Sequence, residues 1–217
     1  MPTPKDRTKS TTAADRSAGI TIRAAVDSDA DWLGRLHSDA LPEAFLPTLG
    51  SRFMRRLYLA MIRDPGGVVL VAEQEGRRVG MASGVASVPA FYRRFYRRHG
   101  VRAALAVGPR LFRPSVIKRM RETASYPDAT TTYPDAEFLT WNVVPEGRGK
   151  GLGEILSHAM VDGLCGKGAT EVKAFAYADN EALNRVFTRT GWERRGLIHL
   201  HEGGRASTLW VISCPSR

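Results

Sequence analysis

The chain switches several times between two patterns of apolar and polar residues. Residues 20–25 alternate apolar and polar side chains, which predicts a strand with one buried face. Apolar runs of strand length follow at residues 68–72, 78–88, 137–144, 170–178, 193–200 and 205–212. Apolar residues spaced three and four apart predict helices at about residues 30–41, 48–63 and 180–190. This succession of strands and helices predicts an α/β protein.

One amphipathic helix follows a cluster of glycines. Its apolar positions are three or four residues apart, at Leu152, Ile155, Leu156, Ala159, Met160 and Leu164. The strand at residues 137–144 leads into this helix through a turn that begins at Pro145, and Gly166 and Gly168 end it. The sequence therefore predicts a strand, a glycine-rich turn and a helix in direct succession.

Glycines occupy positions 149, 151 and 153, where the turn meets the helix. The first turn of a helix has N–H groups without helical partners and the positive end of the helix dipole, so it attracts anions. The spacing does not match G-x-x-x-x-G-K-[ST], because Lys150 and Lys167 are each followed by glycine. It does not match G-x-G-x-x-G either, because residue 154 is Glu. We therefore expect a pyrophosphate-binding turn of another type.

Two stretches of the sequence resemble the GNAT acetyltransferase superfamily. The pattern V-x-P-x-x-R-x-x-G-x-G, which runs from Val143 to Gly153, resembles the acetyl-CoA loop of that superfamily. About thirty residues later, a second stretch runs from Asn180 through Phe187 to a Gly-Trp pair. It resembles the second signature of the superfamily, in which an Asn contacts the pantetheine arm and a Tyr commonly faces the sulfur. The resemblance extends over about residues 20–213.

The resemblance implies a single-domain GNAT-like fold. We expect a mixed central sheet of six to seven strands, splayed between the fourth and fifth strands and flanked by helices. Residues 20–213 would form the acyl-CoA N-acyltransferase domain, after a flexible tail at residues 1–19 that lacks apolar periodicity. Residues 89–136 would form a basic, aromatic helical insertion between the third and fourth strands.

The resemblance also implies a function and a set of contacts. We expect acetyl transfer from acetyl-CoA directly to a primary amine in a ternary complex, without a metal. The backbone N–H near Val143 would hold the thioester carbonyl. The residues expected at the CoA site are Val143, Arg148, Gly149, Lys150, Gly151, Leu152, Gly153, Asn180 and Phe187. The alternative is a catalytically weak or inactive CoA-binding module that docks to a membrane surface or a polyanion.

Glu137 is the expected general base, because it begins the strand at the floor of the expected acceptor groove. The alternative interpretation of Glu137 is a solvated carboxylate at the end of a strand. Phe187 departs from the superfamily pattern, since its ring cannot protonate a leaving thiolate as a Tyr hydroxyl would. Tyr177 is a second source of that hydroxyl, but strand alternation alone leaves its direction open.

One basic segment has an excess of positive charge as large as the net charge of the whole chain, which is +10. Residues 89–121 contain ten Lys or Arg and no Asp or Glu. The sequence FYRRFYRR at residues 91–98 gathers aromatic side chains on one side of a helix and arginines on the other. A short apolar piece at residues 101–107 and a basic helix at residues 115–122 would follow. The aromatic residues either pack on the sheet or on a homodimer partner, or residues 91–121 contact an anionic membrane, an acidic acceptor or nucleic acid.

Two cysteines, Cys165 and Cys214, form neither a spaced framework nor a metal-binding pattern. We therefore expect no disulfide and a cytoplasmic location. No run of 18 apolar residues occurs, and the N-terminus has no apolar segment typical of a signal peptide. The hydrophobic fraction of 43% suits one domain with a substantial core.

Overall fold

A computed structural model describes residues 19–42, 44–108, 114, 116–119, 132–199 and 205–215. Its sheet has seven strands in the order β1-β2-β3-β4-β5-β7-β6. The strands are β1 (Ile20–Ala24), β2 (Gly67–Gln74), β3 (Arg77–Val85), β4 (Ala136–Val143), β5 (Glu171–Tyr177), β6 (Glu193–Ile198) and β7 (Ser207–Ser213). The helices are η1 (Asp27–Asp29), α2 (Ala30–Ala40), α3 (Phe45–Thr48), α4 (Ser51–Arg63), α5 (Val88–Val107), η3 (Pro145–Gly147), α7 (Leu152–Gly166) and α8 (Glu181–Arg189).

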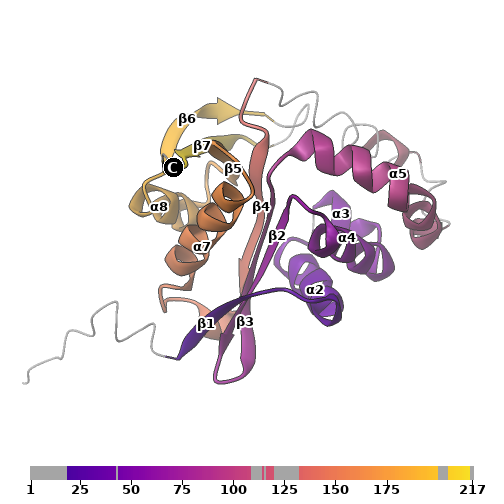
Figure 1. Cartoon of the computed structure of the whole chain (residues 1–217), viewed down its shortest axis with the longest axis horizontal. Coiled ribbons are helices and arrows are strands. Elements are labelled where there is room, and N and C mark those ends of the chain that lie inside the picture. The colour runs from indigo at the N-terminus through magenta and orange to yellow at the C-terminus, as the bar shows by residue number, and fades with distance from the viewer. Residues whose placement is uncertain are drawn as a thin grey trace, which may run out of the picture.

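The sheet separates two layers of helices (Figure 1). Helices α2, α3, α4 and α5 cover one face, and α7 and α8 cover the other. Neighbouring residues of a strand pack against different helix layers because successive side chains point to opposite faces of the sheet. Val71 of β2 belongs to the core under α4, whereas Ala72 belongs to the core under α7. The predicted α/β fold with a mixed sheet is confirmed.

β4 and β5 are parallel neighbours, and they pair over a short length. Their register joins residues 136–138 to residues 172–174 and then stops. Beyond this point β4 continues along β3 as far as Val143, and β5 continues along β7 as far as Tyr177. The two strands therefore diverge in the middle of the sheet, between the fourth and fifth strands as predicted.

A β-bulge in β4 marks the start of this divergence. Phe138 pairs with Gly84 and Thr140 pairs with Ser83, so Leu139 is an extra residue without a partner on β3. A bulge bends its strand and increases the local twist. The bend occurs directly after the last residue of β4 that pairs with β5, and it turns the end of β4 away from β5.

The predicted helices are present, with two differences. Helix α4 starts at Ser51, because a separate one-turn helix precedes it. Helix α5 runs without a break through Gly100 for 20 residues, although the sequence suggested two pieces. A glycine in a helix costs about 1 kcal/mol, and buried side chains on both sides of it, Phe95 and Ala103, hold the helix on the core.

Several predictions fall on parts of the chain that the structure does not describe. They include the tail at residues 1–18, most of the segment 109–131 and the hairpin loop at residues 200–204. Of the basic helix predicted at residues 115–122, residues 116–119 are helical. None of the helices in the described ranges is long and apolar enough to cross a bilayer.

A disulfide joins Cys165 to Cys214, so the expectation of no disulfide is wrong. Cys165 lies near the end of α7, and the chain then turns into β5. Cys214 follows β7, which pairs with β5, and its N–H donates to the carbonyl of Thr170. The fold thus brings the two Cα atoms to 5.7 Å although 49 positions separate them in the sequence. The predicted cytoplasmic location loses the support that it took from unpaired cysteines.

Candidate functional site

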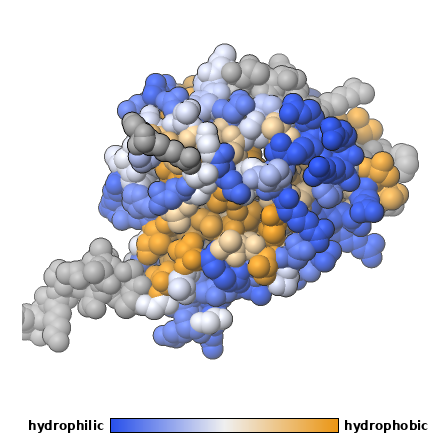
Figure 2. Space-filling model, viewed as in Figure 1, coloured by the Kyte–Doolittle hydropathy of each residue, from blue (hydrophilic) through white to orange (hydrophobic). Residues whose placement is uncertain are grey.

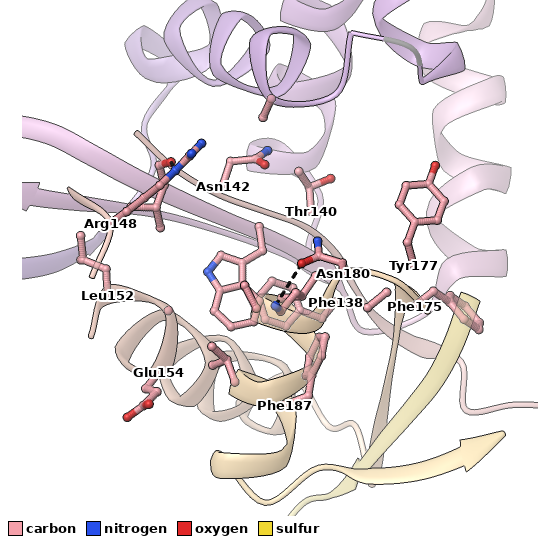
Figure 3. A pocket seen from close by; sticks show the side chains of 18 of the residues that line it. Phe138, Thr140, Asn142, Arg148, Leu152, Glu154, Phe175, Tyr177, Asn180 and Phe187 are labelled. Carbon is pink, nitrogen blue, oxygen red and sulfur yellow. Dashed lines mark hydrogen bonds between the residues drawn. The ribbon is translucent and has the colours of Figure 1, made fainter. Parts of the chain in front are cut away.

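An open cavity of about 1030 Å³ lies where β4 and β5 diverge. Its wall is formed by β4, by the loop and first turn of α7, by the end of β5 and by α8, as Figure 3 shows. Ten of the candidate site residues named from the sequence line it: Glu137, Val143, Arg148, Gly149, Gly151, Leu152, Gly153, Tyr177, Asn180 and Phe187. The structure therefore brings both signature stretches to a single cavity.

The loop before α7 depends on two glycines with left-handed backbone angles. Gly149 has a φ of 74° and Gly151, the N-cap of α7, has a φ of 76°. This conformation is unfavourable for residues with a Cβ atom. A Cβ added at either position would meet no atom within 4 Å, so the space above both residues is open. The backbone at the start of α7 is therefore accessible to an anion from the cavity.

Gly153 lines the cavity and also packs against a ring. A Cβ atom there would lie 3.0 Å from Cζ2 of Trp141, so the missing side chain makes room for that ring. Trp141 in turn stacks on Phe138, with 5.2 Å between the ring centroids. Gly153 thus fixes the distance between α7 and β4, while its backbone N–H still belongs to the first turn of the helix.

The two basic residues of the loop point in different directions. Arg148 lines the cavity, and its Nε donates to the carbonyl oxygen of Val143 at 3.3 Å. Lys150 is not part of the lining, and its Nζ donates to Oε1 of Gln74 at the end of β2. The structure therefore favours the side chain of Arg148, and not that of Lys150, as a contact for an anion in the cavity.

The end of β4 offers backbone N–H groups to the gap. The N–H of Val144 donates to the carbonyl of Val79 in β3 at 3.0 Å. Because successive N–H groups of a strand point to opposite edges, the N–H groups of Val143 and Trp141 point away from β3. Since β5 has already diverged, they face the cavity. The geometry therefore leaves both N–H groups available to a ligand in the cavity.

An asparagine that the sequence analysis did not single out holds α8 against β5. Asn184 donates to the carbonyls of Tyr177 and Asn180, at 3.0 and 2.9 Å, and its Oδ1 accepts from Nε1 of Trp210 at 2.8 Å. Asn180, the predicted pantetheine contact, caps α8 by accepting from the N–H of Leu183. An Asn inside a helix is an unfavourable choice, which is the signal that could have identified Asn184.

Phe187 closes the bottom of the cavity and also belongs to the core. The side chain is 3% exposed. Its ring centroid lies 4.9 Å from that of Trp192 and 5.6 Å from those of Trp141 and Trp210. Phe187 thus forms part of an aromatic cluster on the α7 side of the sheet.

Tyr177 lies on the other face of the sheet. Ala176 packs into the core under α7, so alternation along β5 turns Tyr177 toward the α5 side. Figure 3 shows its hydroxyl pointing away from Phe187, and Arg205 lies over its ring at 4.2 Å from the centroid. Tyr177 therefore lines the gap on the side opposite to Phe187, and its hydroxyl does not replace one at position 187.

Glu137 is buried beside a lysine, so its interpretation as a solvated carboxylate is wrong. The residue is 4% exposed, and its Oε2 lies 3.7 Å from Nζ of Lys173. Lys173 also donates to the carbonyl of Pro134 at 2.7 Å. Burial lowers the pKa of Lys173, although the charge of Glu137 acts in the opposite direction. Burial raises the pKa of Tyr92, and the nearby negative charge of Glu137 raises it further.

Solved structures share this fold at low sequence identity. YncA from Salmonella typhimurium, solved with its cofactor acetyl-CoA, is 19% identical with a TM-score of 0.61 and covers 92% of this chain and 96% of its own. Ard1 from Thermoplasma volcanium is 15% identical with a TM-score of 0.58, covering 92% and 100%. A chimera of the spermidine N-acetyltransferase SpeG from Vibrio cholerae and hSSAT is 15% identical with a TM-score of 0.58, covering 90% and 96%.

The chain matches none of the curated proteins with which it was compared. A model of the acetyltransferase (GNAT) family matches residues 33–192, which include the bulged strand β4, the glycine loop and α8. This match extends over most of the 217 residues and agrees with the fold and with both signature stretches. The chain therefore belongs to the GNAT acetyltransferase family.

Proposed function

We propose that this protein transfers an acetyl group from acetyl-CoA directly to a primary amine, within a ternary complex. The observation that carries the proposal is the continuity of one cavity. It joins the open glycine loop at the start of α7 to the gap between β4 and β5, and Glu137 lines the same space. The donor, the acceptor and a base would therefore lie next to one another in this cavity.

The donor site follows from the backbone. A pyrophosphate would sit over Gly149 and Gly151, where the N–H groups of the first turn of α7 and the side chain of Arg148 are available. The pantetheine arm would lie in the gap like an added strand. The N–H of Val143 would donate to the thioester oxygen, and a donor of this kind is worth about a hundredfold to a thousandfold in rate.

The acceptor must reach the thioester as a neutral amine. An alkylamine with a pKa near 10.4 is only about one part in a thousand uncharged at pH 7, so a base accelerates the reaction. The nitrogen lone pair forms the C–N bond, and the carbonyl electrons move to the oxygen. The C–S bond then breaks, and the sulfur keeps its electron pair. The proton lost by nitrogen would pass to Glu137, directly or through water.

Departure of the thiolate proceeds without a tyrosine hydroxyl at position 187. A thiol has a pKa near 8.5, so its thiolate is a tolerable leaving group that water can protonate. The phenylalanine ring also favours one alternative, a CoA-binding module without catalysis. The two functions differ only in whether an amine is consumed.

The test combines acetyl-CoA with a panel of primary amines and measures thiol release and acetylated product by mass spectrometry. We expect product from at least one amine, with Glu137→Gln about 10² to 10⁴ times slower at unchanged CoA affinity. CoA binding in calorimetry without product from any amine would establish the binding module instead. Absence of both would reject the donor site itself.

A further inference from the structure

The exposed side of α4 and α5, away from the cavity, carries more arginines than carboxylates can neutralise. Arg55 pairs with Asp31, and Arg63 pairs with Asp27. Within the described part of the chain, six further exposed arginines on these helices have no carboxylate within ion-pair distance. They are Arg52, Arg56, Arg93, Arg97, Arg98 and Arg102.

Arginines of both helices lie close enough to His99 for their charges to affect its pKa. Desolvation lowers the pKa of His99 first, and the charges of Arg102, Arg63, Arg98 and Arg56 lower it further. Two of these arginines come from α4 and two from α5. The two helices therefore share a single region of positive potential.

A groove lies between the helices within this region. Its volume is about 300 Å³, and it is lined by Arg52, Arg55, Arg56, Leu105 and Ala106. Guanidinium groups bind phosphate oxygens through paired N–H donors. The groove therefore suits a phosphate group, and Leu105 of α5 forms its apolar rim.

The outer face of α5 combines charge with protruding aliphatic side chains. Positions 98, 101, 102 and 105 lie within one side of a helix that turns 100° per residue. On this side Val101 is 77% exposed and Leu105 is 75% exposed, with Arg98 and Arg102 beside them. Figure 2 shows apolar side chains at the right-hand edge of the molecule, where α5 ends in Figure 1, next to a broad hydrophilic area.

We propose that this α4–α5 face binds the surface of a membrane that contains anionic phospholipids. Lipid phosphates would contact the arginines of the groove, and Val101 and Leu105 would enter the interface between headgroups and acyl chains. Basic residues next to exposed aliphatic residues are the pattern of proteins that lie on a bilayer without crossing it.

The aliphatic side chains decide between this partner and two others. A nucleic acid would pair with the arginines, but its sugar-phosphate backbone has no apolar layer for Val101 and Leu105. In a symmetric dimer through this face the same patch would meet itself. Like charges from Arg52, Arg56 and Arg102 would then oppose their own copies without acidic partners. A lipid surface satisfies both the charges and the aliphatic groups.

The experiment uses the full chain and sedimentation with phosphatidylcholine vesicles, with or without 30% phosphatidylglycerol. We expect binding to the anionic vesicles that decreases steeply between 0.05 and 0.5 M NaCl. Arg52→Ser with Arg56→Ser should weaken it by about 25-fold, at about fivefold for each arginine. Val101→Ser with Leu105→Ser should weaken it by about tenfold while the charge stays the same.

Matched variants separate this surface from general effects of charge and hydrophobicity. Arg77→Ser with Arg194→Ser removes two exposed arginines from β3 and β6, and Val26→Ser with Leu197→Ser removes two exposed aliphatic residues elsewhere. Both should bind like the parent, and thermal unfolding midpoints establish that each variant is folded.

Three outcomes would overturn the proposal. They are no binding to either vesicle, equal binding to neutral and anionic vesicles, and binding that survives Val101→Ser with Leu105→Ser. If the third is accompanied by tight binding to a DNA duplex that the arginine variants abolish, the face is a polyanion site. None of these measurements involves acetyl-CoA, so their failure would not bear on the proposed acetyl transfer.

Discussion

Glu137 of β4 pairs with Lys173 of β5, one position before the pairing of these strands ends, and Nζ of Lys173 lies 3.7 Å from Oε2 of Glu137. Both side chains are almost fully buried, at 1% and 4% exposure. A buried carboxylate without a cation would take up a proton at neutral pH. An ammonium at Lys173 therefore stabilises the ionised form of Glu137 at the point where the strands diverge and the cavity begins.

Lys173→Met should destabilise the protein, since it leaves a buried carboxylate without its cation. Breaking such a pair costs about 3–5 kcal/mol, whereas replacing both partners costs much less. The double variant Lys173→Met with Glu137→Gln should therefore be more stable than Lys173→Met alone. Urea unfolding measures both. Lys150→Met is the control, because that ammonium contacts the amide of Gln74 and not a carboxylate.

The same substitution should move the pH profile of the reaction. Loss of the cation disfavours the ionised carboxylate of Glu137, so the acidic limb of kcat/KM should shift to higher pH. Two results would show that Lys173 does not govern the charge of Glu137. One is an acidic limb that is unchanged in Lys173→Met. The other is a double variant whose loss of stability equals the sum of the losses from the two single substitutions.

Gly151→Trp should abolish CoA binding, because a large side chain would fill the open space over the start of α7. The matched control is Gly168→Trp just after the other end of α7. Gly168 has a φ of 93° and equally open surroundings, so both substitutions carry the same kind of backbone strain. Calorimetry with CoA should detect no binding for Gly151→Trp and normal binding for Gly168→Trp. Equal affinities would place the pyrophosphate elsewhere.

The parts of this fold that sequence could predict are those with local causes. The period of the apolar residues in α7 and the glycines at 149 and 151 are written in consecutive residues, so the turn and the helix could be predicted together. The divergence of β4 from β5 was available only through the resemblance to a known family. Nothing in the residue types around Leu139 marks a bulge, because any side chain can occupy it.

The unpredicted features depend on residues that are distant in the sequence. The partner of Glu137 comes from β5, and the partner of Cys165 comes from the end of the chain. The contact between Gly153 and Trp141 could not be predicted either, because it exists only when β4 and α7 are packed. Such contacts follow from the assembled sheet and not from spacing along the chain.

Asn184→Leu should destabilise the protein and weaken CoA binding, because it removes the contacts that join α8 to β5. The buried Nε1 of Trp210 would lose its acceptor, and a lost partner of this kind costs about 1–3 kcal/mol. Asn184→Asp keeps an acceptor for Trp210 but loses the donor to the carbonyls of Tyr177 and Asn180. Comparing the two by chemical denaturation and calorimetry separates the two halves of the contact. Equal stability in all three proteins would contradict this role.

Phe187→Tyr should raise turnover with CoA affinity nearly constant, if a hydroxyl at this position reaches the leaving sulfur. The gain is bounded by the factor of about 10² to 10⁴ that a general acid supplies. Phe187→Leu, the control, offers no hydroxyl and should lose stability because the ring packs among three tryptophans. Thiol release measured under single-turnover conditions reports the step directly. Turnover that falls in Phe187→Tyr would show that the hydroxyl is buried in the aromatic cluster instead.

His37 makes the stability of the protein dependent on pH in the acidic range. Its ring is buried under α4, with Nδ1 2.8 Å from the hydroxyl of Tyr58, and burial lowers its pKa from 6.5 to about 4. Between these two values the unfolded chain binds more protons than the folded protein, so stability falls as the pH falls from 6.5 toward 4. The full effect corresponds to about 3 kcal/mol.

The variant His37→Gln isolates this contribution, because glutamine does not titrate and still offers polar atoms to Tyr58. We expect urea midpoints of the parent protein to decrease from pH 7 to pH 4.5, and those of His37→Gln to decrease less. The pKa of Asp29 is lowered chiefly by its hydrogen bonds to Arg23, so its contribution to the stability of the protein also decreases in acid. This decrease is the same in both proteins and cancels in the difference between them. Parallel pH curves for the two proteins would mean that His37 is protonated as readily in the folded protein as in the unfolded chain.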